Sequence, residues 1–268
     1  MGAIATDARR VRYEVRSILA GYPALYLAYA RRAHPAGRGK VLAADTQLVI
    51  EGFTRSANTF AVMAFQLAQP EPVRVARHLH APAHVAMAAS KGVPTLLCIR
   101  GPEATVLSTV IREPYLSIRQ GLRNYVRFYR DVARYSSHVA AATFEDITSD
   151  FGKVTRRINE RYGTGFAEFD HSPANVELCF SLSEHRSRRP EWRKALADFQ
   201  SGIIGLPQLE QVMDPASTEA AKPVPEANVS RPSKDRRAIK EQLRARYAGE
   251  DLAALRRKAS EAYLALAT

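Results

Sequence analysis

The sequence predicts an α/β protein with a central parallel β-sheet flanked by helices and with helical extensions at both ends. From Thr46 onward, short β-branched or aliphatic runs alternate with helical segments, which is typical of parallel sheets covered on both faces. Within that region, "VIEGFTRSANTFAV" (49–62) passes from a strand through a short polar loop directly into an apolar helical pattern. Helical patterns before and after the alternating region supply the extensions.

The alternating core, 46–166, has four expected strands. They lie at 46–52, 73–77, 95–99 and 138–144, and helices are expected at 58–68, 83–90, about 103–111, 116–135 and about 150–162. Right-handed crossovers place the loops that follow the strands along one edge of such a sheet, which is where ligands bind. We therefore expect functional residues directly after the strands.

The rest of the chain is assigned to the same single domain, 1–268. Alternation stops after Phe166, and prolines stand at positions 207, 215, 223, 225 and 232, which predicts an irregular cap or linker over 167–232. Ser233 then precedes two helical patterns that fill 233–268.

The N-terminal segment, 7–45, begins with a basic amphipathic helical pattern over 7–32. Its apolar side consists of Val11, Val15, Ile18 and Leu19. Pro23 is expected to break or kink the helix. Such a helix could make peripheral contact with a membrane or partner, or it could pack on the domain and expose its arginines. The second interpretation is favoured because basic faces are common on solvated helices.

Composition and charge restrict the class of protein. The chain is 46% hydrophobic and 25% charged, as in ordinary globular proteins, and its 39 Lys+Arg against 27 Asp+Glu give a net charge of +12, which favours anionic partners. Cys98 and Cys179 lie in apolar runs without metal-ligand spacing, so a reducing, cytoplasmic compartment is expected, with membrane association left open. No run reaches the roughly 18 apolar residues of a membrane span.

The loop of 49–62 is suited to anion binding. A strand, a loop and a helix N-terminus together present unpaired backbone N–H groups and the positive end of a helix dipole. Compared with the P-loop pattern GxxxxGK[ST], Gly52 is present but the second glycine and the lysine are missing, which disfavours an ATPase or GTPase. Arg55, earlier in this P-loop-like unit, supplies a cation instead.

This loop, "TRSANTF", resembles the 5′-phosphosulfate loop of the sulfotransferases that use 3′-phosphoadenosine 5′-phosphosulfate (PAPS). The resemblance implies that the cofactor is bound by Arg55, Ser56, Ala57, Asn58, Thr59 and Phe60. In "LLCIRGPEATVLSTV", Arg100 and Ser108 have the separation of the family's pair that binds the 3′-phosphate. An arginine fork and a serine hydroxyl from a helix end both suit phosphate oxygens.

A third matching segment is "RHLHAPAHV", which stands where the family has Lys-x-His-x-Pro. The resemblance implies that His80 is the base that deprotonates the acceptor hydroxyl, with His78 at the lysine's place. Histidine exchanges protons near neutral pH, and general-base help contributes roughly 10²–10⁴ in rate. Two other interpretations of His78, His80 and His84 stay open, namely a metal site and ordinary loop histidines.

Further segments match more loosely. Glu145 and Asp146, in the family's strand-Glu-Asp-Leu segment, are interpreted as structural. The tail phrase "VSRPSKDRRAIKE" occupies the place of the family's basic loop over the 3′-phosphate and offers Arg231. Ala57 stands where glycine is usual and would be strained if the loop needs a positive φ there. Arg55 and Gly101 also replace a lysine and an aspartate of the family.

The implied function is transfer of a sulfuryl group from PAPS to a hydroxyl acceptor, with no metal and no nucleic acid. The acceptor would be a carbohydrate, a lipid-linked glycan or a small alcohol. The segment 112–135 could line its cleft through Tyr115, Tyr125, Phe128, Tyr129 and Tyr135, although Tyr125 and Tyr129 have core spacing. Two alternatives remain: a kinase-like phosphotransferase, and a non-catalytic basic module that binds membranes or nucleic acid.

Overall fold

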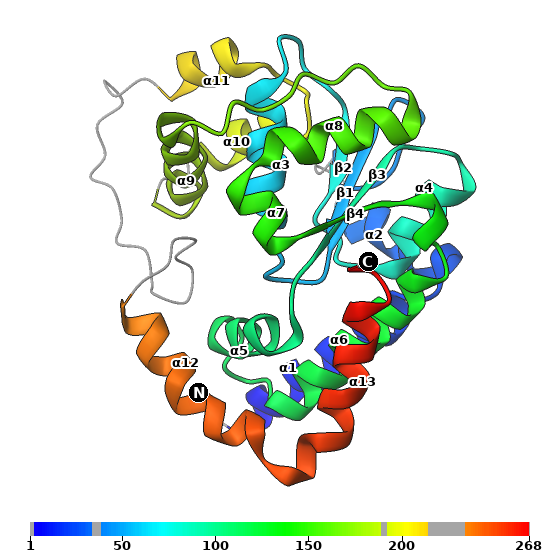
Figure 1. Cartoon of the computed structure of the whole chain (residues 1–268), viewed down its shortest axis with the longest axis vertical. Coiled ribbons are helices and arrows are strands. Elements are labelled where there is room, and N and C mark those ends of the chain that lie inside the picture. The colour runs from blue at the N-terminus through cyan, green and yellow to red at the C-terminus, as the bar shows by residue number, and fades with distance from the viewer. Residues whose placement is uncertain (1–2, 34–38, 189–191, 214–233, 268) are drawn as a thin grey trace.

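A computed structural model describes residues 3–33, 39–188, 192–213 and 234–267. Its centre is a four-stranded sheet with the order β2-β1-β3-β4, in which every pair of neighbours is parallel (Figure 1). The strands are β1 (Leu48–Gly52), β2 (Val75–Arg77), β3 (Thr95–Ile99) and β4 (Ala140–Thr143). The predicted fold class, a parallel α/β sheet flanked by helices with helical extensions, is confirmed.

The strands are mainly apolar because both faces of the sheet are covered. Every residue of β1, β2 and β3 is buried, and the central pair aligns Ile50 with Leu96 and Gly52 with Cys98. Strands buried on both faces appear in sequence as near-continuous apolar runs, which is why "LVI" and "TLLCI" were recognisable.

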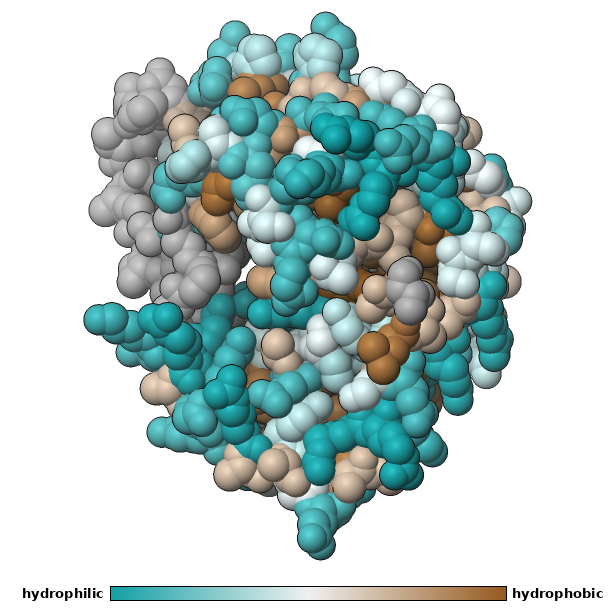
Figure 2. All heavy atoms as spheres, in the orientation of Figure 1, coloured by the Kyte–Doolittle hydropathy of each residue, from teal (hydrophilic) through white to brown (hydrophobic). Residues whose placement is uncertain are grey.

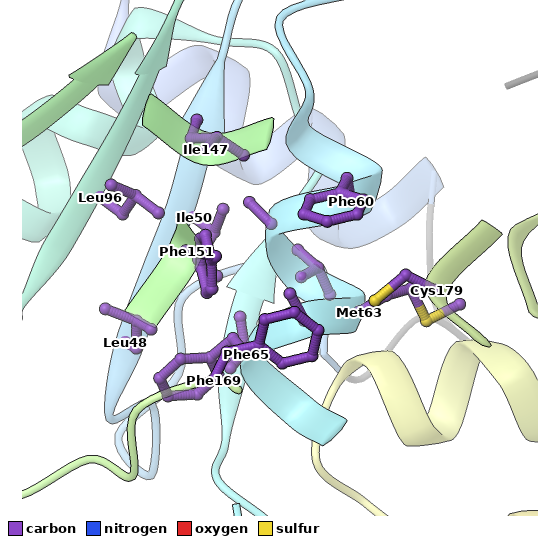
Figure 3. Packing of buried hydrophobic residues seen from close by; sticks show 14 of the residues in the cluster. Leu48, Ile50, Phe60, Met63, Phe65, Leu96, Ile147, Phe151, Phe169 and Cys179 are labelled. Atoms are coloured by element: carbon purple, nitrogen blue, oxygen red, sulfur yellow. The ribbon is translucent and has the colours of Figure 1, made fainter. Parts of the chain in front are cut away.

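One face of the sheet packs against helices that come mainly from the second half of the chain. These are α3 (Asn58–Ala68), α7 (Phe144–Ser149), α8 (Phe151–Tyr162), α9 (Pro173–Arg188) and α10 (Arg193–Gln200). Figure 3 shows Leu48, Ile50 and Leu96 of the strands beside Phe60 and Phe65 of α3, in the buried cluster that also contains Phe151, Phe169 and Cys179.

The opposite face packs against α4 (Pro82–Ser90), α5 (Pro102–Arg112) and α6 (Ile118–Ala133). Helix α2 (Pro23–Ala33) packs on α4, and the C-terminal α13 (Ala253–Leu264) packs on α6. Leu97 and Ile99 of β3 meet Tyr125 and Tyr129 of α6 in this layer. Helix α12 (Lys234–Ala248) runs beside α5 on the same side of the molecule (Figure 1).

The prediction of irregular structure over 167–232 is wrong for much of that range. Helices α9, α10 and α11 (Leu206–Val212) form there, while 214–233 lie outside the described residues. Pro173 begins α9 and Pro207 stands in the first turn of α11, where the missing N–H costs nothing. The prolines therefore mark helix starts in this part of the chain, and Cys179 and Leu182 of α9 complete the core.

The N-terminal segment breaks at Pro23 as predicted, into α1 (Ala3–Leu19) and α2. The favoured interpretation, that this segment packs on the domain and exposes its arginines, is confirmed: α1 contacts α6, and Arg9 and Arg12 are exposed. The apolar side of α1, however, does not make this contact. Val11, Val15 and Ile18 are 62%, 49% and 44% exposed. Helix α1 instead packs through polar side chains: Glu14 pairs with Arg127 of α6 at 2.8 Å, and Ser17 bonds Asn124 at 3.2 Å.

The surface is mixed in character. The face drawn in Figure 2 is mainly hydrophilic, with hydrophobic side chains scattered over it. Among the described helices, none combines the length and the apolar character that crossing a membrane requires.

Candidate functional site

A cavity of about 1050 Å³ opens where the loops after β1, β2 and β3 meet. Its walls come from these loops and from helices α1, α2, α5 and α12, so both ends of the described chain contribute. The predicted residues that line it are Arg55, Ala57, Asn58, Thr59, Phe60, His80, Arg100 and Ser108. The expected position of a ligand site, at the carboxyl edge of a parallel sheet, is where this cavity lies.

The loop after β1 is tightly folded. Arg55 and Ala57 have positive φ angles of 68° and 66°, so the condition under which Ala57 is strained is met, at a cost on the order of 1 kcal/mol. Asn58 closes the loop by donating its side-chain N–H to the Phe53 carbonyl at 2.9 Å. Ala57 directly precedes α3 and provides no side-chain cap. The first N–H groups of α3 therefore lack a side-chain acceptor at the cavity wall.

Three predicted anion ligands are joined by hydrogen bonds. Arg55 Nε donates to Ser108 Oγ at 2.9 Å, and Arg100 Nη1 donates to the Arg55 carbonyl at 3.0 Å. The Arg100 guanidinium also lies 3.7 Å from the ring centroid of Phe144, which holds it in place. One expectation is corrected: Ser108 does not lie at a helix end, because α5 already begins at Pro102.

The other predicted cofactor residues differ in where they lie. Thr59 Oγ1 lies 3.1 Å from His78 Nε2 at the cavity wall, and Phe60 packs against Phe180. Ser56 does not line the cavity, because its hydroxyl is buried 3.2 Å from the Tyr129 hydroxyl. Arg231 lies outside the described residues.

His80 is held in one orientation. Its Nδ1 lies 2.8 Å from the Gly52 carbonyl oxygen. Because a carbonyl oxygen only accepts, Nδ1 carries the proton, and the lone pair is left on Nε2. His80 lines the cavity, so this tautomer can accept a proton from a bound ligand.

Sequence reasoning missed the residue that positions His80, which is Glu51 of β1. Its fully buried carboxylate accepts hydrogen bonds from Leu79 N–H at 2.7 Å, His80 N–H at 2.9 Å and His84 Nδ1 at 3.0 Å. Burial alone raises the pKa of Glu51, but the hydrogen bonds and nearby histidines outweigh it, so the pKa is lowered from its ordinary value. The signal was a single acid in an otherwise apolar strand.

These bonds stabilise an unusual loop. His78 and His80 both have positive φ angles, 61° and 51°. Such backbone persists only where surrounding contacts determine it. The carboxylate of Glu51 provides two of these contacts, and the Tyr26 hydroxyl and Arg16 add two more at the Leu79 carbonyl, at 3.0 and 3.2 Å.

His84 has a structural role that is separate from the other two histidines. It is fully buried, with Nδ1 on Glu51 and with Nε2 accepting the Leu42 N–H at 3.1 Å. Both ring nitrogens are therefore engaged, and His84 cannot join His78 and His80 around an ion in this arrangement. Within the described ranges, no group of three or more His, Cys, Asp or Glu side chains is arranged to hold a metal ion.

Contacts also settle the interpretation of Asp146, Tyr125 and Tyr129. Asp146 and Thr143 form a capping box at the start of α7, and Asp146 pairs with Arg157 at 3.1 Å. Tyr125 and Tyr129 are fully buried with ring centroids 4.6 Å apart, which confirms their packing role. Phe128 is the aromatic residue of that segment that lines the cavity.

The cavity is strongly cationic. Its described lining contains the basic residues Arg16, Lys40, Arg55, Arg100, Arg112, Arg193, Arg236, Arg237 and Lys240, and one carboxylate, that of Glu113. Burial and the charges of Arg236, Arg112 and Arg100 lower the pKa of Arg55 to about 10. Burial and Arg100, Arg236 and Arg55 lower the pKa of Lys240 to about 8. Bringing so many like charges together is unfavourable without an anion, which would relieve the repulsion.

Helix α12 supplies the cations that sequence reasoning missed. Arg236, Arg237 and Lys240 belong to the tail phrase that had been assigned to the 3′-phosphate region, but only Arg231 was selected from it. The spacing of 236 and 240, one helical turn apart, was the available signal. Local sequence could not show which other segments line the cavity together with α12.

Lys240 leads to a testable pH dependence. An anion favours the charged ammonium, so binding should weaken as Lys240 loses its proton above pH 8. We expect the affinity for adenosine 3′,5′-bisphosphate to fall at least about fivefold between roughly pH 7 and 9.5. Calorimetric titration across this range measures it.

Two variants make that measurement specific. Lys240→Met should bind more weakly at neutral pH and show little further fall, whereas Lys153→Met, on the exposed surface of α8, should behave like the parent. An unchanged pH profile in Lys240→Met would contradict the assignment. Lys240 affects the stability of the fold in the opposite direction. Its pKa is lower in the folded chain than in the unfolded chain, so above pH 8 the unfolded chain binds more protons, and the contribution of Lys240 to the free energy of unfolding should rise with pH.

Comparisons with protein-family models, curated proteins and solved structures found no match for this chain. The class of site is therefore defined by its own geometry. It is a cationic cavity at the carboxyl edge of a parallel sheet, with an uncapped helix N-terminus and an oriented histidine.

Proposed function

We propose that this chain is a sulfotransferase that moves a sulfuryl group from PAPS to a hydroxyl acceptor. The observation that supports it most directly is the linked set Arg100–Arg55–Ser108, which lies in one cationic cavity with His80. A nucleotide with a 5′-phosphosulfate and a 3′-phosphate needs two separate anion positions. We assign one position to the start of α3 with Arg55 and the other to Arg100 with Ser108, and the bond between Arg55 and Ser108 makes these two positions adjacent.

In this proposal the residues have distinct roles. The N–H groups at the start of α3 and the Arg55 side chain bind the phosphosulfate, and Arg100 and Ser108 bind the 3′-phosphate. The acceptor oxygen attacks sulfur as the bond between sulfur and the 5′-phosphate oxygen breaks. The acceptor proton passes to His80 Nε2, and adenosine 3′,5′-bisphosphate leaves with its charge stabilised by Arg55.

The cavity also has room for an acceptor. Ligand cavities are typically about 300–1,000 Å³, so this one could hold a nucleotide with a second molecule. The wall formed by α1 and α2 includes Tyr13 and Tyr29, whereas the hydroxyl groups of Ser17 and Tyr26 are hydrogen-bonded within the protein. Such a wall suits a carbohydrate, a lipid-linked glycan or a small alcohol. No metal ion, redox cofactor or nucleic acid has a role in the proposal.

Calorimetric titration with adenosine 3′,5′-bisphosphate tests the cofactor assignment. We expect selective binding over adenosine 5′-phosphate and over ATP with Mg²⁺. Replacing Arg100 by alanine should weaken binding by at least roughly thirtyfold, because it removes a partly buried charge that contacts the phosphate. Arg156→Ala removes the same charge from the exposed surface of α8 and should bind like the parent.

Other outcomes would replace the proposal. A preference for ATP that depends on Mg²⁺ would favour the phosphotransferase. Indifference to all three nucleotides, with salt-dependent binding to anionic lipid or polynucleotide, would favour the non-catalytic module. Arg100→Lys, which keeps the charge but loses the planar fork, separates a general electrostatic effect from a specific contact.

A further inference from the structure

The first two helices expose an apolar stripe that nothing in the described chain covers. The α1–α2 stripe consists of Val11, Val15, Ile18, Tyr22, Leu25 and Tyr29, which are 44–63% exposed. Six of the eleven exposed large hydrophobic residues in the described ranges lie in this short segment, while the other five are spread over the remainder. Scattered exposed apolar residues are normal, but a concentration of them indicates a surface of contact.

The stripe follows helical spacing. On α1, Val11, Val15 and Ile18 are separated by four and three residues, so they share one face. On α2, Leu25 and Tyr29 are four residues apart. The buried residues of α2, Tyr26, Leu27 and Ala30, lie on its other side and hold it to the domain. Apart from Tyr22, which lies in the turn between α1 and α2, the exposed apolar side chains are thus on helices that are already anchored by their other faces.

The charges beside the stripe are positive. Arg9, Arg12, Arg31 and Arg32 are exposed on the same two helices. The two acids of this segment are each paired with arginine, Asp7 with Arg10 at 3.2 Å and Glu14 with Arg127 at 2.8 Å. An apolar helix face flanked by arginines matches a bilayer that carries anionic headgroups, and tyrosine is favoured at the boundary between acyl chains and water.

We propose that the α1–α2 stripe docks this chain on the surface of an anionic lipid bilayer, with both helices lying in the headgroup region. The apolar side chains enter the acyl boundary while the arginines contact phosphates. Tyr29 belongs both to the stripe and to the cavity wall, so the docked chain holds the rim of the cavity close to the membrane. This docking is independent of the reaction proposed above.

Cosedimentation with vesicles of phosphatidylcholine, with and without phosphatidylglycerol, tests the docking. We expect the full chain to bind the anionic vesicles and to release them at high salt. Val15→Asp combined with Leu25→Asp should lower binding at least about tenfold. Arg12→Gln should lower it roughly fivefold, because one basic residue near the surface is removed.

A matched control distinguishes the stripe from general surface effects. Val212→Asp, at a residue 51% exposed on α11, changes the same side-chain type and should leave vesicle binding at the parental level. The parent failing to bind anionic vesicles would overturn the proposal. The proposal would also be overturned if the parental protein formed dimers, the stripe variants were monomers, and lipid had no effect on either. The stripe would then bind a second copy of the chain.

Discussion

Replacing His80 by asparagine should lower the rate of the proposed sulfuryl transfer by about 10²–10⁴, because the proposal assigns the lone pair on Nε2 as the proton acceptor for the attacking hydroxyl. Asparagine is chosen because residue 80 has a φ of 51°, which asparagine tolerates better than alanine. The rate is measured as release of adenosine 3′,5′-bisphosphate from PAPS, with hydroxyl acceptors selected by screening.

Binding and chemistry must be separated in that experiment. The His80→Asn protein should bind adenosine 3′,5′-bisphosphate with parental affinity, since His80 is assigned to the acceptor and not to the nucleotide. Added imidazole should restore part of the rate to a His80→Gly protein, in which glycine also tolerates the positive φ and leaves space for the base. Parental turnover in His80→Asn would remove the base assignment while leaving the cofactor site intact.

Replacing Glu51 by alanine should lower the free energy of unfolding by about 3–5 kcal/mol. The substitution leaves three buried donors, Leu79 N–H, His80 N–H and His84 Nδ1–H, without their acceptor. Urea denaturation measures the loss. Glu168→Ala, which breaks an exposed ion pair with Arg156, should leave stability nearly unchanged and serves as the control.

The same carboxylate determines a dependence on pH. The pKa of Glu51 is lowered in the folded chain, so its stabilisation is complete above the ordinary value of 4.5 and is lost as the pH falls towards the lowered pKa. Glu51→Gln should retain partial stability and lose this part of the acid dependence. A parent and a Glu51→Gln protein with identical acid unfolding would contradict the role of the ionised carboxylate.

Sequence patterns predicted most of the core because each depends on neighbouring residues. The strands at 48–52 and 95–99 were visible as apolar runs, and the loop between Gly52 and Asn58 was visible as a short polar break before an apolar helix. Pro207 misled because it lies in the first turn of a helix, and a proline in the first turn looks the same in sequence as a proline in a loop.

The part of the candidate site that lies directly after the strands was predictable from the sequence. Arg55, His80 and Arg100 come shortly after β1, β2 and β3, and parallel strands bring such positions to one edge. Glu51 was not predicted because its partners, near residues 79–84, belong to another part of the chain. Its acidic side chain inside an apolar strand had meaning only once the pairing of strands was known.

The sequence by itself determined the α/β class, the parallel sheet and the order of the strand-end residues, because these depend on local periodicity and on the handedness of crossovers. Only the tertiary structure decided which distant cations share the cavity and which side of α1 faces solvent. Amphipathicity shows that a helix has two faces, but polar contacts with α6, such as that between Glu14 and Arg127, select the face that packs. Those contacts join residues more than a hundred positions apart, beyond the reach of any local pattern.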